Sequence, residues 1–456
     1  MAVHTEAKAS QLRSSFLRLD AEFFKPEYVE AEAHTAAIPL YGRLGPLCER
    51  ITQGSNPAFS QSGLACVNGK NVYFGTMEEG DPNYVSPAEF KRLASYRLRR
   101  NDIVITLKHA TKVGRAWIVE DRQPRIFSRN VGLIRLRSDS PIRHSVLLLY
   151  LWTNYGQLLI ERAATGGTTG QITLPMSELK RLPVPLIAEI EQQRIDDIFW
   201  QSRSAARESS GKYLIAKKLI NEALKLDCFE FHKVTGYTTY FSEVESSLRF
   251  DAQHHQPRFM RLIDHLAAFF PQRVRDIRTI NRRGLQPVYI EGGPIDIVNS
   301  QHLGVTQIDY DKLEKTGREA FAAAKEAHVR KDDLLIYTTG AYVGRTNVYL
   351  REAPAMASNH VNILRLKPGI DAAYMALVFQ SVVGQFQTLK YARGSAQAEL
   401  YPSDIDRFLV PILGSQTQQE IGNLVRQSVA KQQESKWLLE EAKARVEQLV
   451  QEAAQS

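Results

Sequence analysis

Residues 181–194, RLPVPLIAEIEQQR, recur as RFLVPILGSQTQQE at residues 407–420, and this repeated stretch decides the fold. Each copy begins with a proline-bearing turn and runs into a segment that contains one glycine and no proline. A turn of this kind, followed by a long stretch without helix breakers, is typical of a helix start. The sequence therefore predicts long helices over residues 189–226 and from residue 417 to the C-terminus.

The repeat extends upstream through each half of the chain. RLDA at 18–21 recurs as RFDA at 249–252, and NDIVI at 101–105 recurs as DDLLI at 332–336. The offset between the copies drifts only from 231 (18 to 249) to 226 (181 to 407), which indicates two copies of one folding unit rather than chance matches. A period of this length excludes a solenoid repeat and indicates a duplicated domain.

Composition narrows the class of protein. The chain has 456 residues, enough for about two to four domains. Its net charge of +8 favours a polyanionic partner such as nucleic acid. The longest apolar run, 146–152, is far shorter than the ~20 residues that a membrane span needs, and the N-terminal residues have no apolar signal core. The three cysteines form no CxxC pair, so we expect a cytoplasmic protein with reduced thiols and no membrane contact.

Each half has the same order of local patterns. Short runs rich in β-branched residues predict strands, and they are residues 103–106, 116–119 and 134–136 in the first half and 334–337, 346–350 and 363–366 in the second. A more helical patch follows in each half, at 144–162 and at 372–393.

The two long helices share one heptad profile. Their predicted seams are apolar at the ends and small or polar in the middle, and the apolar or small positions are Ile195, Phe199, Ala206, Tyr213 and Ile220 in the first helix and Ile421, Val425, Leu439, Val446 and Leu449 in the second. Because such a profile reads the same in either direction, the helices can pair antiparallel, with apolar ends facing apolar ends. The alternative is that each helix packs only on its own domain.

These patterns predict an α+β fold. We expect two duplicated mixed α/β domains, separated by two long helices that form an antiparallel coiled coil, with pseudo-two-fold symmetry. The expected boundaries are a first domain at 1–186, a first helix at 187–227, a second domain at 228–413 and a second helix at 414–456.

The join between domain and helix resembles the end-of-domain pattern of the specificity (S) subunits of type I restriction–modification systems. In the first copy the resemblance rests on Gly170-Gln171, Leu174, Ser177, Leu179, LPVPL at 182–186 and EQQRI at 191–195. In the second it rests on Ala396-Gln397, Leu400, Ser403, Ile405, LVPI at 409–412 and QQEI at 418–421. In the family's pattern a glutamate precedes the paired glutamines. The second copy has Gln416 and Thr417 there instead, at a helix start where the change does not disturb the pattern.

This resemblance, which covers nearly the whole chain, implies a function. Each globular domain would be a target-recognition domain that reads one half of a split sequence in double-stranded DNA. The paired helices would fix the gap between the halves and dock two methyltransferase (M) subunits, with restriction (R) subunits joining for cleavage. S-adenosylmethionine would bind the partner methyltransferase, so this chain would hold no cofactor and catalyse nothing.

The residues themselves agree with a non-catalytic role. The sequence contains no GxGxxG, no Walker A loop and no Asn/Asp-Pro-Pro-Tyr motif. The pair His254-His255 has no further ligand at metal spacing and is interpreted as a surface pair, so no metal site is expected. Two alternatives stay open: a duplicated protein-interaction scaffold, and a nuclease or methyltransferase whose active site is not recognised.

Three regions carry candidate DNA-binding residues, because phosphates and base edges are contacted by Lys, Arg, amide and hydroxyl groups. The first is the loop after strand 103–106 and its counterpart, with Lys108, His109, Lys112 and Arg115, and Thr339, Tyr342 and Arg345. The second is a Gly-rich loop and its counterpart, with Gly167, Gln171, Arg393 and Gln397. The third precedes a strand, with Arg129, Asn130, Asn359 and His360.

Positions that the copies share should serve the fold or contact phosphate, whereas positions that differ should select sequence. Arg115 and Arg345 belong to the shared class, and each is expected either to contact phosphate or to form an internal ion pair. The divergent class comprises Lys108, His109, Lys112, Thr339 and Tyr342.

Overall fold

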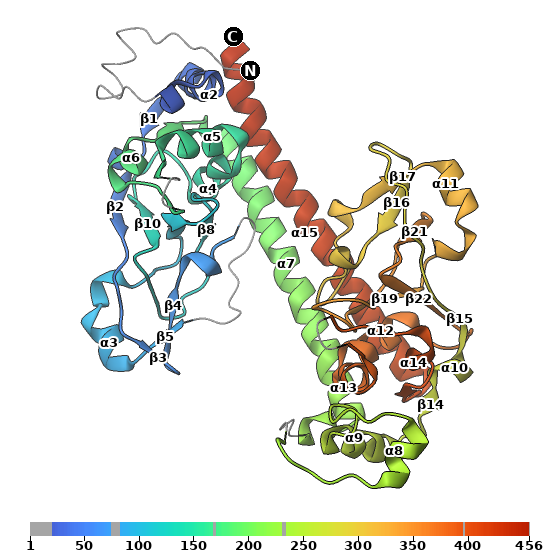
Figure 1. The fold of residues 1–456 in the computed structure, drawn as a ribbon. Helices are drawn as coiled ribbons and strands as arrows, with labels where there is room; N and C mark the ends of the chain where they lie inside the picture. Colours follow the sequence, from blue (N-terminus) through green and yellow to red (C-terminus); the bar gives the residue numbers. More distant parts are fainter. Residues whose placement is uncertain (1–20, 74–82, 167–169, 230–233, 395–396, 456) are drawn as a thin grey trace. The chain divides into compact units, whose positions relative to one another are not determined.

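A computed structural model describes residues 21–73, 83–166, 170–229, 234–394 and 397–455 (Figure 1). The described chain forms two compact units. Unit 1 combines Met1–Ser204 with Glu434–Ser456, and unit 2 is Ala205–Gln433. The long helices α7 (Glu189–Ala223) and α15 (Ser415–Gln455) therefore each contribute one half to each unit.

Unit 1 is built on a four-stranded antiparallel sheet. Its order is β2 (Cys48–Gln53), β10 (Val131–Leu136), β6 (Ile103–Thr106) and β8 (Ala116–Ile118). A second sheet has the order β3 (Phe59–Ser60), β5 (Asn83–Val85), β4 (Leu64–Val67) and β9 (Arg125–Phe127), with β4 and β9 parallel. The helices are α2 (Pro26–Ala37), α3 (Pro87–Arg92), α4 (His144–Trp152), α5 (Asn154–Ala163) and α6 (Met176–Arg181). Strand β1 (Tyr41–Arg43) pairs with β13 (Pro183–Pro185), next to the start of α7.

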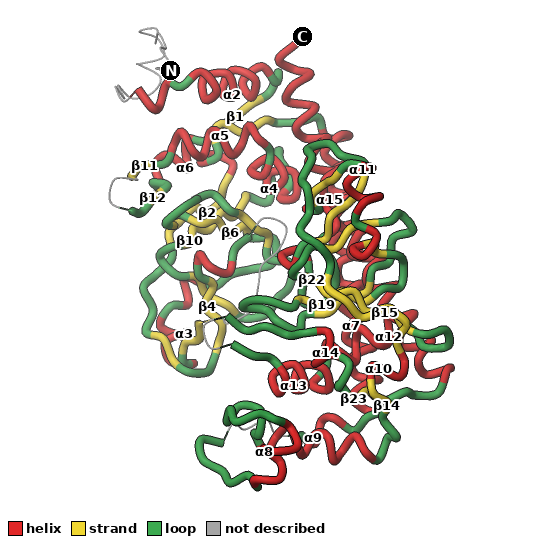
Figure 2. Tube along the Cα trace, turned by 45° about the vertical axis from the view of Figure 1, so that its right-hand side comes forward, coloured by secondary structure: helices red, strands yellow, loops and turns green. Residues whose placement is uncertain are grey.

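Unit 2 repeats this topology. Its central sheet has the order β15 (Arg278–Arg283), β22 (Val361–Leu366), β19 (Leu334–Tyr337) and β20 (Thr346–Val348). The second sheet is β17 (Glu314–Thr316), β16 (Ile295–Val298), β21 (Ala355–Ala357) and β18 (His328–Val329), again with one parallel pair, β16 and β21. The helices are α8 (Phe241–Ser247), α9 (Pro257–Ala267), α10 (Val274–Ile277), α11 (Arg318–Ala323), α12 (Ala372–Gln380), α13 (Val382–Tyr391) and α14 (Pro402–Ile405). Strand β14 (Gln272–Arg273) pairs with β23 (Leu409–Val410). Figure 2 distinguishes the helices, strands and loops of the described chain by colour.

Each helical patch that the sequence predicts as one segment is broken into two helices. The break lies at Thr153 in unit 1 and at Ser381 in unit 2, where the side-chain hydroxyl accepts a backbone N–H and caps the next helix. A tyrosine on the first helix of each pair, Tyr150 or Tyr374, then donates to the carbonyl of Pro183 or Pro411 at 2.9 Å. This bond ties the helix pair to the proline-bearing turn that precedes each long helix.

The long helices lie side by side and run antiparallel (Figure 1). In unit 1 the Ser202 hydroxyl donates to the carbonyl of Ser435 at 2.7 Å, and in unit 2 the Ser209 hydroxyl donates to the carbonyl of Ser428 at 2.7 Å. Adding 226 to Ser202 gives Ser428, and adding 226 to Ser209 gives Ser435, so the register is unchanged when the two helices are exchanged. Serine is small enough to let the backbones approach and supplies the donor that satisfies the facing carbonyl.

The helices also enter the core of each unit. Ile195 and Phe199 share one hydrophobic cluster with Ala442 and Val446 in unit 1. In unit 2, Ile220 shares a cluster with Ile421 and Val425. Packing on the globular part and pairing between helices therefore occur together rather than as alternatives.

Burial along the predicted seam follows the period of a straight helix. The fully buried seam residues are Ile195, Phe199, Ile220, Ile421 and Val446, and Val425 is nearly so. Ala206, Tyr213, Leu439 and Leu449 are half-buried, whereas their neighbours Ala205, Leu438 and Val450 are buried. An α-helix of 3.6 residues per turn drifts against a strict heptad, which explains why burial moves by one residue.

Candidate nucleic-acid interface

The loop after β6 begins as a short strand rather than as free loop. Lys108 and His109 form β7, which pairs with β12 (Ile172–Thr173), and β12 in turn pairs with β11 (Thr165–Gly166). The ring Nδ1 of His109 accepts the N–H of Thr111 at 3.1 Å and so shapes the turn. Burial and then the charge of Arg115 lower the pKa of His109.

This small sheet brings together the three candidate regions of unit 1. Leu107 is the meeting point: its N–H donates to the carbonyl of Asn130, and its carbonyl accepts the N–H of Leu174, both at 2.8 Å. Arg129 and Gln171 are exposed beside it. Gly167 lies outside the described residues.

Unit 2 builds the same junction around Thr338. Its N–H donates to the carbonyl of His360 at 3.0 Å, and its carbonyl accepts the N–H of Leu400 at 2.8 Å. Glu399 forms bridges with both Thr339 and Arg393, in place of the β7, β11 and β12 strands of unit 1. The three candidate regions therefore converge at equivalent positions in both units, although they are distant in sequence.

The side chains at the two junctions differ. Lys112 in unit 1 pairs with Glu161 at 3.6 Å. Unit 2 instead presents Tyr342, whose side chain is 55% exposed and lies edge-on to Tyr337. Asn359 is half-buried, and Gln397 and His360 are exposed.

The two shared arginines contact aromatic rings. The Arg345 guanidinium lies 3.7 Å from the ring centroid of Tyr342, and that of Arg115 lies 5.1 Å from Tyr73. Arg115 also donates to the carbonyl of Gly69 at 3.2 Å. Neither arginine has a carboxylate within ion-pair distance among the described residues, so the ion-pair interpretation has no support.

Unit 2 contains a polar cluster that was not predicted from the sequence. Arg283 pairs with Glu399 at 2.8 Å, and the hydroxyl of Tyr401 donates to the same carboxylate at 2.6 Å. The Tyr401 hydrogen bond, followed by the one from Arg283, lowers the pKa of Glu399, which stays charged. The equivalent residues in unit 1 are Gln53, Thr173 and Pro175, so a comparison of the copies could have flagged these positions.

Arg393 is held at the edge of this cluster. Its guanidinium donates to Asp404 at 2.7 Å, and the Asp404 carboxylate is completely buried. The side chain is therefore oriented by an ion pair while remaining exposed to solvent.

The paired histidines are not a surface pair. His254 is 4% exposed, and its Nδ1 donates to the carbonyl of Lys390 at 2.8 Å, so the sequence interpretation is wrong for this residue. Over the described part of the chain, no three His, Cys, Asp or Glu side chains gather as a metal site would need. No helix in that part has the length and apolar character required to cross a bilayer.

No protein-family model matches the chain, and no curated protein matches it. Among solved structures, it is similar to the S subunit of a type I restriction–modification system from M. genitalium, with 13% identity over 91% of this chain and 95% of that chain and a TM-score of 0.45. It is also similar to the HsdS subunit from Thermoanaerobacter tengcongensis, with 14% identity over 91% and 96% of the chains and a TM-score of 0.28. A partial match is to the type IIG restriction endonuclease BpuSI, with 13% identity over 41% and 29% of the chains and a TM-score of 0.30. Over most of its length, the chain thus resembles S subunits of type I restriction–modification systems.

Proposed function

We propose that this chain is a non-catalytic DNA-specificity subunit that reads a bipartite target and docks two methyltransferase subunits. In this proposal each unit reads one half-site, and α7 and α15 fix the gap. S-adenosylmethionine belongs to the methyltransferase, and restriction subunits join the complex for cleavage. The protein acts in the cytoplasm, where its DNA substrate lies.

One observation carries the proposal. The central sheets of the two units have the same strand order, and in both units three separate candidate regions meet at equivalent positions around Leu107 and Thr338. The scaffold is the same, but the exposed side chains differ, with Lys108 and His109 in one unit and Thr339 and Tyr342 in the other. Two readers on one framework with different contact residues suit a target whose halves differ in sequence.

The first test is single-molecule methylome sequencing of the source genome with and without this gene. We expect loss of methyladenine at a split motif, with two short half-sites around a fixed gap. A continuous motif, or a motif that persists without the gene while the partner methyltransferase is expressed, would falsify the proposal.

A second test separates the alternatives. The purified chain is incubated with S-adenosylmethionine and mixed DNA, alone and with the methyltransferase subunit. We expect methyl transfer only in the presence of the partner. Methyl transfer or cutting by the chain alone would support an unrecognised enzyme, and weak DNA binding without sequence preference would support an interaction scaffold.

A further inference from the structure

Two pockets lie at equivalent places in the two units, away from the junctions described above. The pocket in unit 1 has a volume of about 290 Å³ and the pocket in unit 2 about 370 Å³. Strand register establishes their equivalence: Arg43 faces Pro183 in the β1–β13 pair, and Arg273 faces Leu409 in the β14–β23 pair. Each pocket is lined by three arginine or lysine side chains, and His254 and His255 also line the pocket in unit 2.

The pocket in unit 1 carries its own counter-charges. The Glu32 carboxylate lies 2.5 Å from the Arg162 guanidinium and 3.5 Å from that of Arg43. The third cation, Arg181, pairs with Glu178 at 3.0 Å. Every arginine that lines this pocket therefore has a carboxylate partner.

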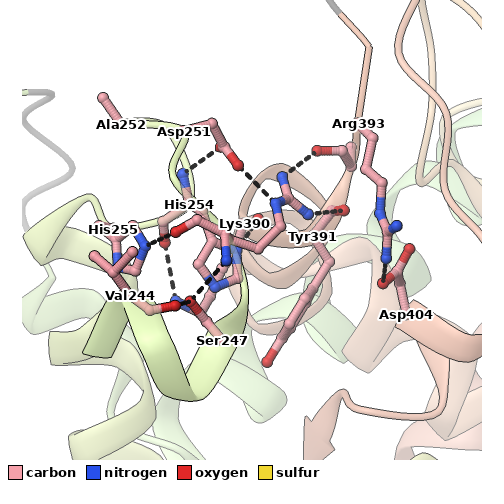
Figure 3. Close-up of polar contacts among 12 residues, drawn as sticks. Val244, Ser247, Asp251, Ala252, His254, His255, Lys390, Tyr391, Arg393 and Asp404 are labelled. Carbon is pink, nitrogen blue, oxygen red and sulfur yellow. Dashed lines mark hydrogen bonds and ion pairs between the residues drawn. The ribbon is translucent and has the colours of Figure 1, made fainter. Parts of the chain in front are cut away.

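The pocket in unit 2 keeps the cations and loses these carboxylates. Arg273, Lys390 and Arg407 stand where unit 1 has Arg43, Arg162 and Arg181, but Ile263 replaces Glu32. Asp404, which replaces Glu178, is buried and bonded to Arg393 instead (Figure 3). Among the described residues, neither Arg273 nor Arg407 has an ion-pair partner.

Lys390 is built into this pocket rather than left on the surface. It is 6% exposed, and its Nζ donates to the carbonyl of His254 at 2.9 Å (Figure 3). Arg162 makes the equivalent bond to the carbonyl of Phe23 at 2.8 Å. The two units thus place a cation at the same point by the same backbone contact.

The charges around the unit 2 pocket are strongly unbalanced. Glu243 is the acid that lines it, and the Glu243 carboxylate already accepts the hydroxyl of Thr239 and the N–H of Tyr240. Burial lowers the pKa of Lys390, because its ammonium group loses solvent, and the charges of Glu243 and Asp251 oppose this shift without cancelling it. A bound anion would remove this imbalance.

We propose that the pocket in unit 2 binds an oxyanion, either a carboxylate or a phosphate group, at the place that the Glu32 side chain fills in unit 1. Arg273, Lys390 and Arg407 are its ligands. Charge-assisted hydrogen bonds from arginine suit both kinds of group. The inference does not rest on the proposed function, since a chain that failed to read DNA would still bind the anion.

The experiment titrates the full-length protein with inorganic phosphate and, separately, with acetate, by calorimetry at constant ionic strength in chloride. We expect one saturable site, and the anion that binds more tightly identifies the source chemistry. The variant Ile263→Glu supplies the missing carboxylate. The new carboxylate should pair with the basic side chains and so weaken anion binding roughly tenfold or more. The matched variant Ile263→Gln has the same shape without the charge and should bind as the original chain does.

A reverse variant tests the comparison between the units. Glu32→Gln releases Arg43 and Arg162 and should add a second binding equivalent. Circular dichroism of each variant confirms that it is folded. The proposal is wrong if the unmodified chain shows no saturable site for either anion, or if Ile263→Glu and Ile263→Gln bind alike.

Discussion

At the scale of the residue, the two units share a buried aspartate at equivalent positions, Asp102 and Asp333. Asp102 and Asp333 each accept two bonds from an arginine on the neighbouring strand, with the Nε of Arg135 or Arg365 at 2.7 Å. Each aspartate follows a residue with positive φ, 71° at Asn101 and 66° at Asp332, a conformation that asparagine and aspartate tolerate better than most residues. The ion pair therefore locks the turn that leads into the central strand and, beyond it, the candidate interface.

We predict that Asp102→Asn destabilises the protein by about 3–5 kcal/mol, because it leaves the Arg135 charge buried without its partner. Asp139→Asn is the matched control, since Asp139 pairs with Arg137 on the surface and should leave stability unchanged. Denaturant unfolding measures both variants. Equal stability of the two would contradict the structural role of Asp102.

Tyr342 allows the proposed recognition of DNA sequence to be tested at a single residue. We expect Tyr342→Ala to weaken specific DNA binding roughly tenfold, which is about the cost of losing one base contact in a duplex site, and to alter only one half-site. Tyr289→Ala, which removes another exposed tyrosine of unit 2, is the control. Electrophoretic mobility shifts with scrambled half-sites measure the effect, and a change in both half-sites would argue against independent readers.

At the scale of the element, the repeated Gln-Gln motif acquires a physical role. The side chain of Gln192 donates to the carbonyl of Ile187 and accepts the N–H of Arg143, and Gln418 makes the equivalent bonds to Leu413 and Asp371. Both glutamines are nearly fully buried. Each long helix is thus pinned at its start to the first helix of the preceding helix pair.

The serine contacts between α7 and α15 predict that leucine substitutions at two adjacent positions of α7 differ sharply in their effect on stability. Ser209 is 5% exposed and faces Ser428, whereas Ser210 is exposed. Ser209→Leu should cost about 1–3 kcal/mol through overpacking, and Ser210→Leu should cost little. The midpoint of urea unfolding measures both, and a reversed order would show that the helices do not pair in this register.

Much of this architecture was accessible from the sequence because the duplication let each half check the other. The strands 103–106 and 334–337 were predicted with their observed bounds, since short apolar runs between turn residues are a strong signal. The pairing of β7 with β12 was not, because two residues of backbone pairing leave no periodic pattern. The cluster of Arg283, Glu399 and Tyr401 was also missed, since its members meet only after the sheets form.

At the scale of the whole molecule, the helix pair should behave as a spacer. We predict that four residues inserted after Ala205, matched by four after Lys431, lengthen both helices by about 6 Å and the gap in the methylated motif by about two base pairs. Both half-sites should stay unchanged. Insertion into α7 alone is the control, because it shifts one helix against the other and breaks the contact between Ser202 and Ser435. Altered half-sites after the paired insertion would contradict the spacer hypothesis.

Because unit 1 is assembled from two separate segments of the chain, removal of the C-terminal segment should destabilise unit 1 more than unit 2. Deletion of residues 434–456 removes Ala442 and Val446 from the cluster that contains Ile195 and Phe199, but it leaves unit 2 whole. Hydrogen exchange should accelerate in β6 and much less in β19. Equal acceleration in both strands would contradict the division into these units.

The same division has a consequence for biosynthesis. Unit 2 is one continuous stretch, whereas unit 1 needs residues from both ends of the sequence. On the ribosome, the part of this apolar cluster that Ala442 and Val446 complete, beside Ile195 and Phe199, therefore stays exposed until the last helix emerges. The unit that is translated first is therefore completed last. A stalled or prematurely terminated chain exposes a hydrophobic surface that chaperones and proteases recognise.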